Sequence, residues 1–291
     1  MPPTPATGYR LVRLANGAHT LKALDCGETF HPVIGPVAEA QALYLRQMRL
    51  AERIQQAAEE FVIWDVGLGA AANPLTILAA TRAIPAKIRL ESFDHTLEPL
   101  RFAVAHATEL NYLTGYEPSV SELLNTHFAH FINGEQTVSW HLHLGDFPTL
   151  LASAAARLPT RAFPAPHAIL FDAFSPARNP TMWTLPLFRQ LHQLLDPARP
   201  CAMPTYSRST LLRVTLLLAG FYVGAGHATG EKEETTIAAN TLALLEQPLD
   251  RKWLARAERS TSAEPMREPV YRQTPLSPET KALLEAHPQF R

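Results

Sequence analysis

The feature that most constrains the fold is a buried strand that runs through a glycine-rich turn into a helix. Residues 61–66, Phe-Val-Ile-Trp-Asp-Val, are nearly all apolar, which is typical of a strand covered on both faces. Gly67 and Gly69 follow at once, and the apolar residues 75–78 predict the helix behind the turn. A strand, a tight turn and a helix in this order indicate one unit of an α/β fold with a parallel sheet.

The rest of the chain continues the alternation of strands and helices. The sequence predicts seven strands, at residues 61–66, 88–93, 138–144, 168–172, 200–206, 221–227 and 235–243. Helices are predicted from about residue 97 and at 147–155, 182–195 and 210–219. A short charged turn, residues 230–234, joins the last two strands, so we expect a mostly parallel sheet with an antiparallel C-terminal edge.

Three regions are expected along the chain. Residues 1–58 contain a predicted β-hairpin around Asn16-Gly17 and a helical stretch over 35–56, which should pack on the main domain. Residues 59–245 form the predicted α/β domain. Residues 246–291 are predicted to be an extended tail with a short helix near 280–286.

Composition excludes some classes of protein. Hydrophobic residues make up 46% and charged residues 18% of the 291, as in a globular protein. No apolar run reaches the ~18 residues that span a bilayer, and the first residues lack the pattern of a secretory signal. The two cysteines have no metal-ligand spacing, so we expect a cytoplasmic protein with no metal site and no membrane partner. A net charge of −1 counts mildly against a dedicated nucleic-acid binder.

The glycine turn and the end of the next strand suggest a cofactor site. Glycine lets the backbone approach a ligand closely, and the helix behind the turn offers free N–H groups. Asp94 ends the next strand, where its carboxylate is suited to ribose hydroxyls. This pattern fits a methyltransferase, a nicotinamide or flavin protein, or a plain strand-to-helix turn. The candidate cofactor residues here are Asp65, Gly67, Gly69, Asn73 and Asp94.

Two later strand ends add to this site. Asp146, after the strand at 138–144, is placed to accept from an adenine amine, or alternatively to cap the helix at 147–155. Asp172 opens the loop Phe-Ser-Pro-Ala-Arg-Asn-Pro, which is unusual for a simple turn. In a doubly wound sheet such a loop lies at the carboxyl ends of the strands, where ligands bind.

These motifs resemble those of the tRNA 5-(aminomethyl)uridine methyltransferases, of the free-standing MnmD type and the N-terminal half of the bifunctional MnmC enzyme. The resemblance covers roughly residues 28–240. The family pattern E-x-G-F-G-T-G-L-N is similar to residues 65–73, and S-F-E to 92–94. The pattern D-A/G-F-S/A-P-x-K-N-P-x-x-W matches residues 172–183 with Arg178 in place of lysine. The matches upstream are Thr29, Phe30, His31, Pro32, Gly35 and Glu39.

The resemblance implies a Rossmann-like class I methyltransferase fold and S-adenosylmethionine as cofactor. The implied reaction is methyl transfer to the primary amine of 5-aminomethyluridine at the tRNA wobble position. Asp172 is the implied catalytic residue, because it lies where the amine must be oriented and must lose a proton. The implied substrate-binding residues are His31, Glu39, Arg178 and Asn179; His31 is also compatible with a packing role.

Three departures from the family pattern leave alternatives open. Ala71 stands where the family has a glycine, and the turn at 230–234 is acidic where the family turn is basic. No segment resembles the FAD-dependent oxidoreductase half of the bifunctional enzyme, so no demodification step is expected. A methyltransferase of small-molecule amines and a noncatalytic RNA-binding relative remain the alternatives. A positive rim for RNA would come from Arg178, Arg208, Arg213 and Lys232.

Overall fold

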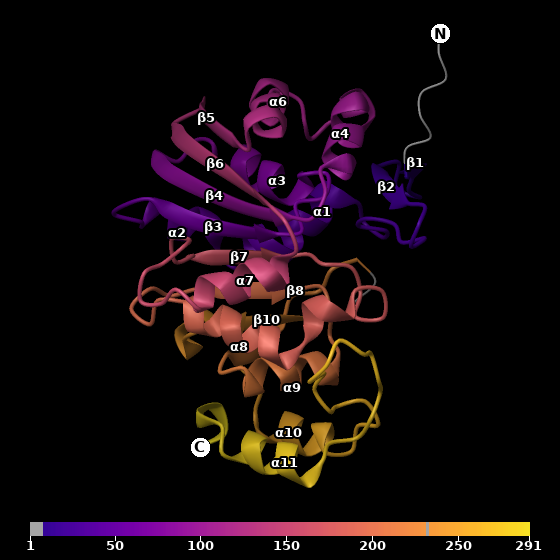
Figure 1. The fold of residues 1–291 in the computed structure, drawn as a ribbon, viewed down its shortest axis with the longest axis vertical. Helices are drawn as coiled ribbons and strands as arrows, with labels where there is room; N and C mark the ends of the chain where they lie inside the picture. The colour runs from indigo at the N-terminus through magenta and orange to yellow at the C-terminus, as the bar shows by residue number, and fades with distance from the viewer. Residues whose placement is uncertain (1–7, 231–232) are drawn as a thin grey trace. The chain divides into compact units, whose positions relative to one another are not determined.

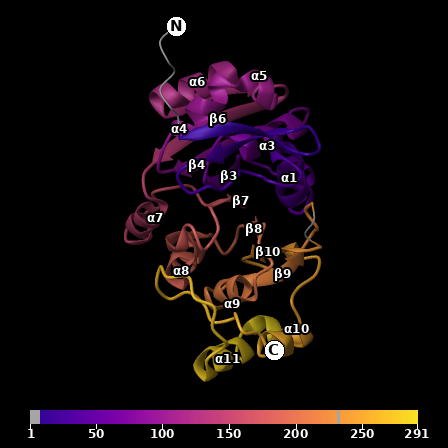
Figure 2. The same ribbon diagram turned by 90° about the vertical axis from the view of Figure 1, so that its right-hand side faces the viewer.

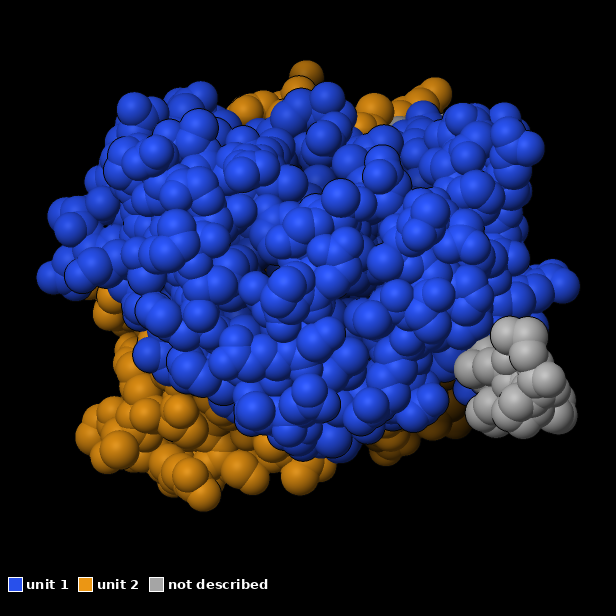
Figure 3. All heavy atoms as spheres, turned by 90° about the horizontal axis from the view of Figure 1, so that it is seen from above, with its two compact units in different colours: residues 1–146, 229–231 blue, residues 147–228, 232–291 orange. Residues whose placement is uncertain are grey.

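A computed structural model describes residues 8–230 and 233–291 of the chain. The residues divide into two compact units, coloured separately in Figure 3. Unit 1 comprises residues 1–146 and 229–231, and unit 2 comprises residues 147–228 and 232–291. The prediction of three regions at 1–58, 59–245 and 246–291 stays a prediction.

Unit 1 contains the N-terminal hairpin and four further strands. Its elements are β1 (Tyr9–Arg13), β2 (His19–Ala23), α1 (Pro36–Ala40), the π-helix η1 (Gln41–Arg46), α2 (Leu50–Gln55), β3 (Phe61–Val66), α3 (Ala72–Thr81), β4 (Ala86–Asp94), α4 (Glu98–Ala105), α5 (Ala107–Leu110), α6 (Glu117–Thr126), β5 (Phe128–Asn133) and β6 (Gln136–Leu144). The strand order is β5-β6-β4-β3, and β1 and β2 form a separate antiparallel pair. The predicted hairpin around Asn16-Gly17 is therefore confirmed.

The strands of unit 1 run parallel except at one edge. β3 pairs with β4, and β4 with β6, in parallel, while β5 is antiparallel to β6. All six residues of β3 are buried, which explains its unbroken apolar sequence. Helix α6 packs on β5 and β6, and α4 packs on α6, on one side of this sheet (Figure 1).

Unit 2 contains the remaining strands and the C-terminal helices. Its elements are α7 (Phe147–Ala155), β7 (Ala168–Phe171), η2 (Pro180–Trp183), α8 (Leu185–Leu194), β8 (Ala202–Thr205), α9 (Thr210–Leu218), β9 (Tyr222–Gly226), β10 (Thr235–Ala239), η3 (Leu242–Leu244), α10 (Arg251–Ala257), α11 (Pro278–Glu285) and η4 (Pro288–Phe290). The strand order is β7-β8-β10-β9, with β7 parallel to β8 and β10 antiparallel to both of its neighbours. The predicted antiparallel C-terminal edge is confirmed, and α9 lies beside β9 and α11 (Figure 2).

Besides the hairpin strands β1 and β2, the described residues contain eight strands, β3 to β10, whereas the sequence predicts seven. The additional strand is β5, in which the exposed residues Phe128, His130 and Ile132 alternate with residues that are buried or partly buried. Its mixture of histidine, asparagine and aromatic residues gave no clear apolar alternation to predict from. Helix α10 was likewise missed, because the region after residue 246 was predicted to be extended.

The predicted helix over residues 35–56 is interrupted. It consists of α1, η1 and α2, and Arg49 has a left-handed backbone conformation between the last two. The predicted helix at 182–195 similarly begins as the short η2 and continues as α8 after Thr184, whose side chain caps α8. The spacing of apolar residues carries no information about the backbone conformation at Arg49 or Thr184, so it does not predict these breaks.

Candidate active site

Three strand ends of unit 1 meet at the same edge of its sheet. In the parallel register Val66 is opposite Phe93, and Asp94 is opposite Leu144. Past the strands, the Gly67 N–H donates to the Phe93 carbonyl at 2.9 Å, and the Gly145 N–H to the Asp94 carbonyl at 2.8 Å. The glycine turn, Asp94 and Asp146 are therefore brought together by backbone hydrogen bonds, as the sequence predicted for the carboxyl ends of parallel strands.

The glycine turn requires left-handed backbone at several positions. Gly67 has φ +91° and Gly69 has φ +52°, conformations that a side chain disfavours. A Cβ at Gly69 would lie 3.1 Å from the ring of Phe30, so the turn also has little room for one. Ala71 has φ +60°, although alanine has no preference for this region. The family glycine at this position would fit the same backbone without strain.

The carboxylate of Asp94 is held in place by backbone groups. Its Oδ2 accepts from the Gly69 N–H at 2.9 Å, and its Oδ1 accepts from the Thr96 N–H at 3.1 Å. The imidazole of His95 lies 3.3 Å from the same Oδ1, and the Asp94 side chain is 8% exposed. A fixed acid beside a glycine turn fits the nucleoside part of a cofactor, since the carboxylate needs no rearrangement to accept from hydroxyls.

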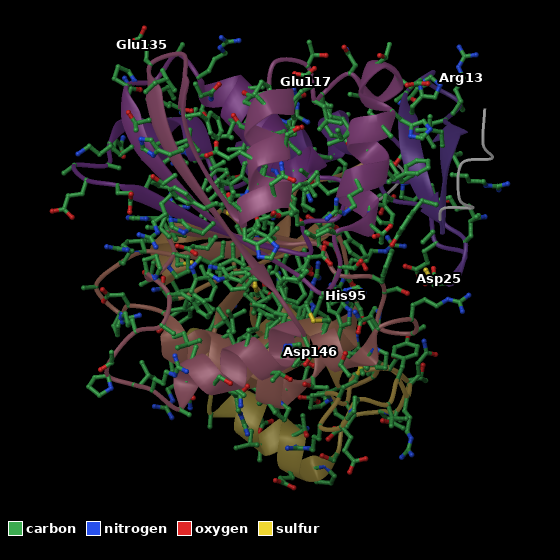
Figure 4. The ribbon with its side chains drawn as sticks, turned by 45° about the horizontal axis from the view of Figure 1, so that its top comes forward. Arg13, Asp25, His95, Glu117, Glu135 and Asp146 are labelled. Carbon is green, nitrogen blue, oxygen red and sulfur yellow. The ribbon has the colours of Figure 1, made fainter. Side chains whose placement is uncertain are left out.

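The region around Asp94 is acidic. The hydrogen bond with Asp94 raises the pKa of His95, and Asp146 and Asp25 act in the same direction. Figure 4 shows Asp25, His95 and Asp146 in this part of unit 1. Burial, followed by the charges of Asp25 and Asp94, raises the pKa of Tyr9 to about 12. The edge of the sheet therefore favours a ligand that carries positive charge or several hydrogen-bond donors.

Asp65 and Asn73 lie deeper than the other predicted cofactor residues. Asp65 is fully buried; its Oδ2 accepts from the Ser92 hydroxyl at 2.8 Å, which in turn accepts from the Trp140 indole N–H at 2.9 Å. Asn73 is 3% exposed in the first turn of α3. Both residues flank the glycine turn in sequence and are buried in the core. Asp146 is exposed at the surface by contrast.

Two of the predicted substrate residues form a pair in unit 1. The Nδ1 of His31 lies 3.8 Å from the Glu39 carboxylate, and both side chains are largely buried. His31 has φ +46°, next to Phe30, whose N–H donates to the Leu21 carbonyl at 2.8 Å. The pair is thus held between the segment that contacts Gly69 and the start of α1.

The sequence did not predict the cluster of aromatic rings formed by Tyr9, Phe30 and Phe102 near the glycine turn. The ring of Tyr9 packs edge-on against Phe30, with centroids 6.3 Å apart, and against Phe102 at 6.2 Å. Tyr9 comes from β1, far from the glycine turn in sequence. No local motif identifies it, because the contact depends on how the hairpin packs.

In unit 2, Asp172 directly follows the buried strand β7 and is partly exposed. Its loop is fixed by two aromatic residues. The indole N–H of Trp183 donates to the Phe174 carbonyl at 2.7 Å, and the hydroxyl of Tyr206 donates to the Ala173 carbonyl at 3.0 Å. The rings of Trp183 and Tyr206 pack at 6.0 Å. Trp183 and Tyr206 therefore clamp the start of the loop from two different segments of the chain.

The other predicted residues of this loop lie in its turn. The N–H groups of Arg178 and Asn179 both donate to the Ser175 carbonyl, at 2.9 and 2.8 Å. The Asn179 side chain accepts from the Thr181 hydroxyl at 2.7 Å, so it stabilises the loop as well as facing its surface. Arg178 is exposed.

Arg213 was expected at the surface in a positive rim, but the structure places its side chain in the interior of unit 2. It is 2% exposed inside unit 2, where it donates to the Thr236 hydroxyl and the Thr235 carbonyl and pairs with Glu234 at 3.2 Å. Arg208 is exposed, as expected, and Lys232 lies outside the described residues.

A hollow of about 710 Å³ lies elsewhere on unit 1, between the hairpin, α1 and α3. It includes Thr76 and Tyr112 but none of the acids at the strand ends, so we do not place the reaction there. Among the residues that the structure describes, no helix is both long and apolar enough to cross a membrane. In the same residues no group of three His, Cys, Asp or Glu side chains is arranged for a metal ion.

Comparisons with known proteins define the class. Residues 117–241 match the model of a family described as S-adenosyl-L-methionine-dependent methyltransferase. The crystal structure of MNMC2 from Aquifex aeolicus superposes with a TM-score of 0.67 over 96% of this chain and 83% of that chain, at 22% identity, which supports the fold. The matched segment and the fold indicate an S-adenosyl-L-methionine-dependent methyltransferase, with S-adenosyl-L-methionine as cofactor.

Within that class the chain is similar to the bifunctional protein MnmC of tRNA 5-methylaminomethyl-2-thiouridine biosynthesis. It is 30% identical over 209 residues to the MnmC proteins of Burkholderia mallei strain SAVP1 and Burkholderia pseudomallei strain 668. The similarity covers 67% of this chain and 30% of each relative. The chain therefore spans less than a third of the length of the curated relatives that it matches.

Proposed function

We propose that the chain methylates the 5-aminomethyl group of the wobble uridine in tRNA, within cytoplasmic 5-methylaminomethyl-2-thiouridine biosynthesis. The observation that carries this proposal is the loop from Asp172 to Trp183, which reproduces the family motif and is clamped at both Ala173 and Phe174. The similarity to MnmC proteins supports the same substrate. Because that similarity covers only part of those relatives, we propose the methyl-transfer step alone.

The cofactor, when bound, supplies a methyl group that its sulfonium makes electrophilic. We propose that Gly67 and Gly69 admit it to the strand ends, that Asp94 accepts from its ribose hydroxyls, and that Asp146 accepts from its adenine amine. Asp94 is suited to this role because its carboxylate is already fixed by the Gly69 and Thr96 N–H groups. The buried Asp65 and Asn73 would act indirectly, by supporting the turn.

We propose that Asp172 orients the substrate amine and takes or relays its proton. A primary amine is largely protonated near neutral pH and has no lone pair for attack until it loses that proton. Alignment of amine and methyl group contributes through effective molarity, about 7–11 kcal/mol in favourable cases. His31, Glu39, Arg178 and Asn179 are proposed to shape the substrate site.

The acidic sequence of the turn at residues 230–234 does not by itself favour a small-molecule amine over RNA as the substrate. Glu234 pairs with the buried guanidinium of Arg213, so this acid has a structural partner.

The proposal is tested by incubating the purified chain with S-adenosyl-L-methionine and tRNA that carries 5-aminomethyl-2-thiouridine. Mass spectrometry of the digested nucleosides should show conversion to the methylaminomethyl form, and none without the cofactor. Parallel reactions with free small amines test the alternative substrate class. Methylation of such amines with no conversion of the tRNA would contradict the proposal.

A further inference from the structure

Helix α10 presents an exposed face made almost entirely of cations. Asp250 caps the helix by accepting from the Trp253 N–H at 2.8 Å, and Trp253, Leu254 and Ala257 are buried. By the 100° spacing of a helix, the residues on the opposite face fall in one stripe. Within α10 they are Arg251, Lys252, Ala255 and Arg256; Arg259 follows just after the helix ends, and all five are exposed, as is Glu258.

The charges of this stripe are not neutralised locally. Within residues 8–230 and 233–291, none of its four cations makes an ion pair or a side-chain hydrogen bond. The two neighbouring acids have other partners, since Asp250 caps the helix and Glu258 binds Lys281 at 3.1 Å. The chain as a whole has a net charge of −1, so this concentration of positive charge is local.

A further exposed cation of unit 2, Arg208, lies close in sequence to the Asp172 loop's anchor Tyr206. Arg208 is exposed and has no ion pair among the described residues. Arg208 also lies two residues after Tyr206, whose hydroxyl holds the Ala173 carbonyl. Unit 2 thus exposes cations both on α10 and at Arg208, two residues after the tyrosine that fixes the Asp172 loop.

We propose that Arg208 and the α10 stripe are a docking surface for the phosphodiester backbone of the substrate tRNA. From Arg251 to Arg256 the helical part of the stripe rises about 7.5 Å, at about 1.5 Å per helical residue, and Arg259 follows beyond the end of the helix. A nucleic-acid duplex carries one negative charge per roughly 1.7 Å of its axis, so several phosphates face such a stripe at once. A small anion needs one or two of these cations, whereas a polyanion engages the whole row.

This inference rests on the proposed function for the choice of tRNA as the polyanion. It also assigns a role to residues beyond those that match the methyltransferase family model, which end at residue 241. Phosphate contacts of this kind position a substrate without reading its sequence. The α10 surface would therefore contribute affinity for tRNA in general, while the Asp172 loop selects the modified base.

The test compares the full chain with a quadruple variant, Arg251→Gln, Lys252→Gln, Arg256→Gln and Arg259→Gln. Glutamine keeps helix propensity and removes the charge. The matched control replaces four exposed cations elsewhere, in Arg10→Gln, Lys87→Gln, Arg101→Gln and Arg157→Gln. Binding of bulk tRNA is measured by fluorescence anisotropy over a series of salt concentrations, together with melting temperature and S-adenosyl-L-methionine affinity.

We expect the α10 variant to bind tRNA at least about 10-fold more weakly, with the slope of log K against log salt reduced by about 3. The control variant should retain most of the slope, and both variants should keep the melting temperature and cofactor affinity of the original chain. Equal tRNA affinity and slope in the α10 variant would overturn the docking surface while leaving the proposed reaction intact. Salt-dependent binding through α10 without nucleoside methylation would support the surface and contradict the reaction. An original chain that does not bind tRNA would overturn the docking surface.

Discussion

The backbone N–H of Gly69 donates to the Asp94 carboxylate at 2.9 Å, which ties the glycine turn after β3 to the end of β4. One carboxylate oxygen therefore has two tasks in our proposal: it fixes the turn, and it accepts from the ribose. The turn and its acid are organised together by the protein alone, so binding does not have to arrange them.

Replacement of Asp94 by alanine should weaken S-adenosyl-L-methionine binding by about 1–3 kcal/mol, because the ribose hydroxyls lose a charged acceptor. The melting temperature should also fall, since the Gly69 and Thr96 N–H groups lose their partner. Calorimetry and thermal unfolding measure both effects. Asp25→Ala is the matched control, because Asp25 belongs to the same acidic region but bonds only the neighbouring Cys26 N–H among the hydrogen bonds described. Unchanged affinity in Asp94→Ala would refute the ribose role.

Ala71 has φ +60°, where a non-glycine residue costs roughly 1–2 kcal/mol. Ala71→Gly should relieve this strain, but glycine also gains freedom in the unfolded chain, worth about 0.5–1 kcal/mol. We therefore expect stability to stay equal or rise by up to about 1 kcal/mol in chemical denaturation. The opposite kind of change at a nearby position, Gly69→Ala, should destabilise the turn. It adds both backbone strain at φ +52° and a close contact with Phe30. A clear loss of stability in Ala71→Gly would contradict the left-handed conformation.

Glu91 should make stability depend on acid pH. It is 1% exposed and binds His143 and Arg89, the latter at 2.6 Å. Burial alone raises the pKa of Glu91, but these hydrogen bonds outweigh it and hold the pKa below its ordinary value of 4.5. The carboxylate is then more favoured in the folded chain, so its contribution is present above pH 4.5 and is lost as pH falls through the folded pKa.

Glu91→Gln tests this linkage. Near pH 7 the variant should unfold at a lower denaturant concentration, because its free energy of unfolding should be about 1–3 kcal/mol lower. The difference from the original chain should shrink as the pH is lowered below 4.5. Glu52→Gln is a suitable control, since its ion pair with Arg49 is exposed and is worth little. A difference that grows in acid would mean that the sign of the pKa shift is wrong.

Asp172→Asn separates catalysis from loop stability. Asparagine keeps the size of the side chain and removes most of its proton affinity, so methyl transfer should fall about 10²-fold or more. Folding and cofactor affinity should persist, because the loop is held independently by Trp183 and Tyr206. Turnover and melting temperature are measured on one preparation. Near-normal turnover with a modest fall in melting temperature would show that Asp172 only shapes the loop.

The sequence predicted the parts of the fold that depend on local pattern. The buried strand β3, the glycine turn and the hairpin at Asn16-Gly17 each have a signal within a few residues. β5 and α10 were missed because their burial is set by neighbours distant in sequence, as with Trp253 stacking on Phe290 at 6.4 Å. In a segment as short as the seven residues of α10, such packing does not produce a recognisable hydrophobic periodicity.

The same distinction applies to the candidate site. Asp94 and Asp146 follow predicted strands, so their meeting could be inferred from parallel pairing. Tyr9 could not be placed beside Phe30, because β1 reaches that position only through tertiary packing. Arg213 was predicted at a surface because arginine is rarely fully buried, and its partners Glu234 and Thr236 lie 21 and 23 positions further along the chain.

The pairing of the buried Arg213 with Glu234 should constrain how the two positions can change in related sequences. A guanidinium this deeply buried is costly without an opposite charge, so loss of Glu234 alone would leave it uncompensated. A homologue with a basic turn at this place should therefore carry an uncharged residue where this chain has Arg213. We expect the two positions to change together along lineages, with intermediates that keep Arg213 without Glu234 selected against.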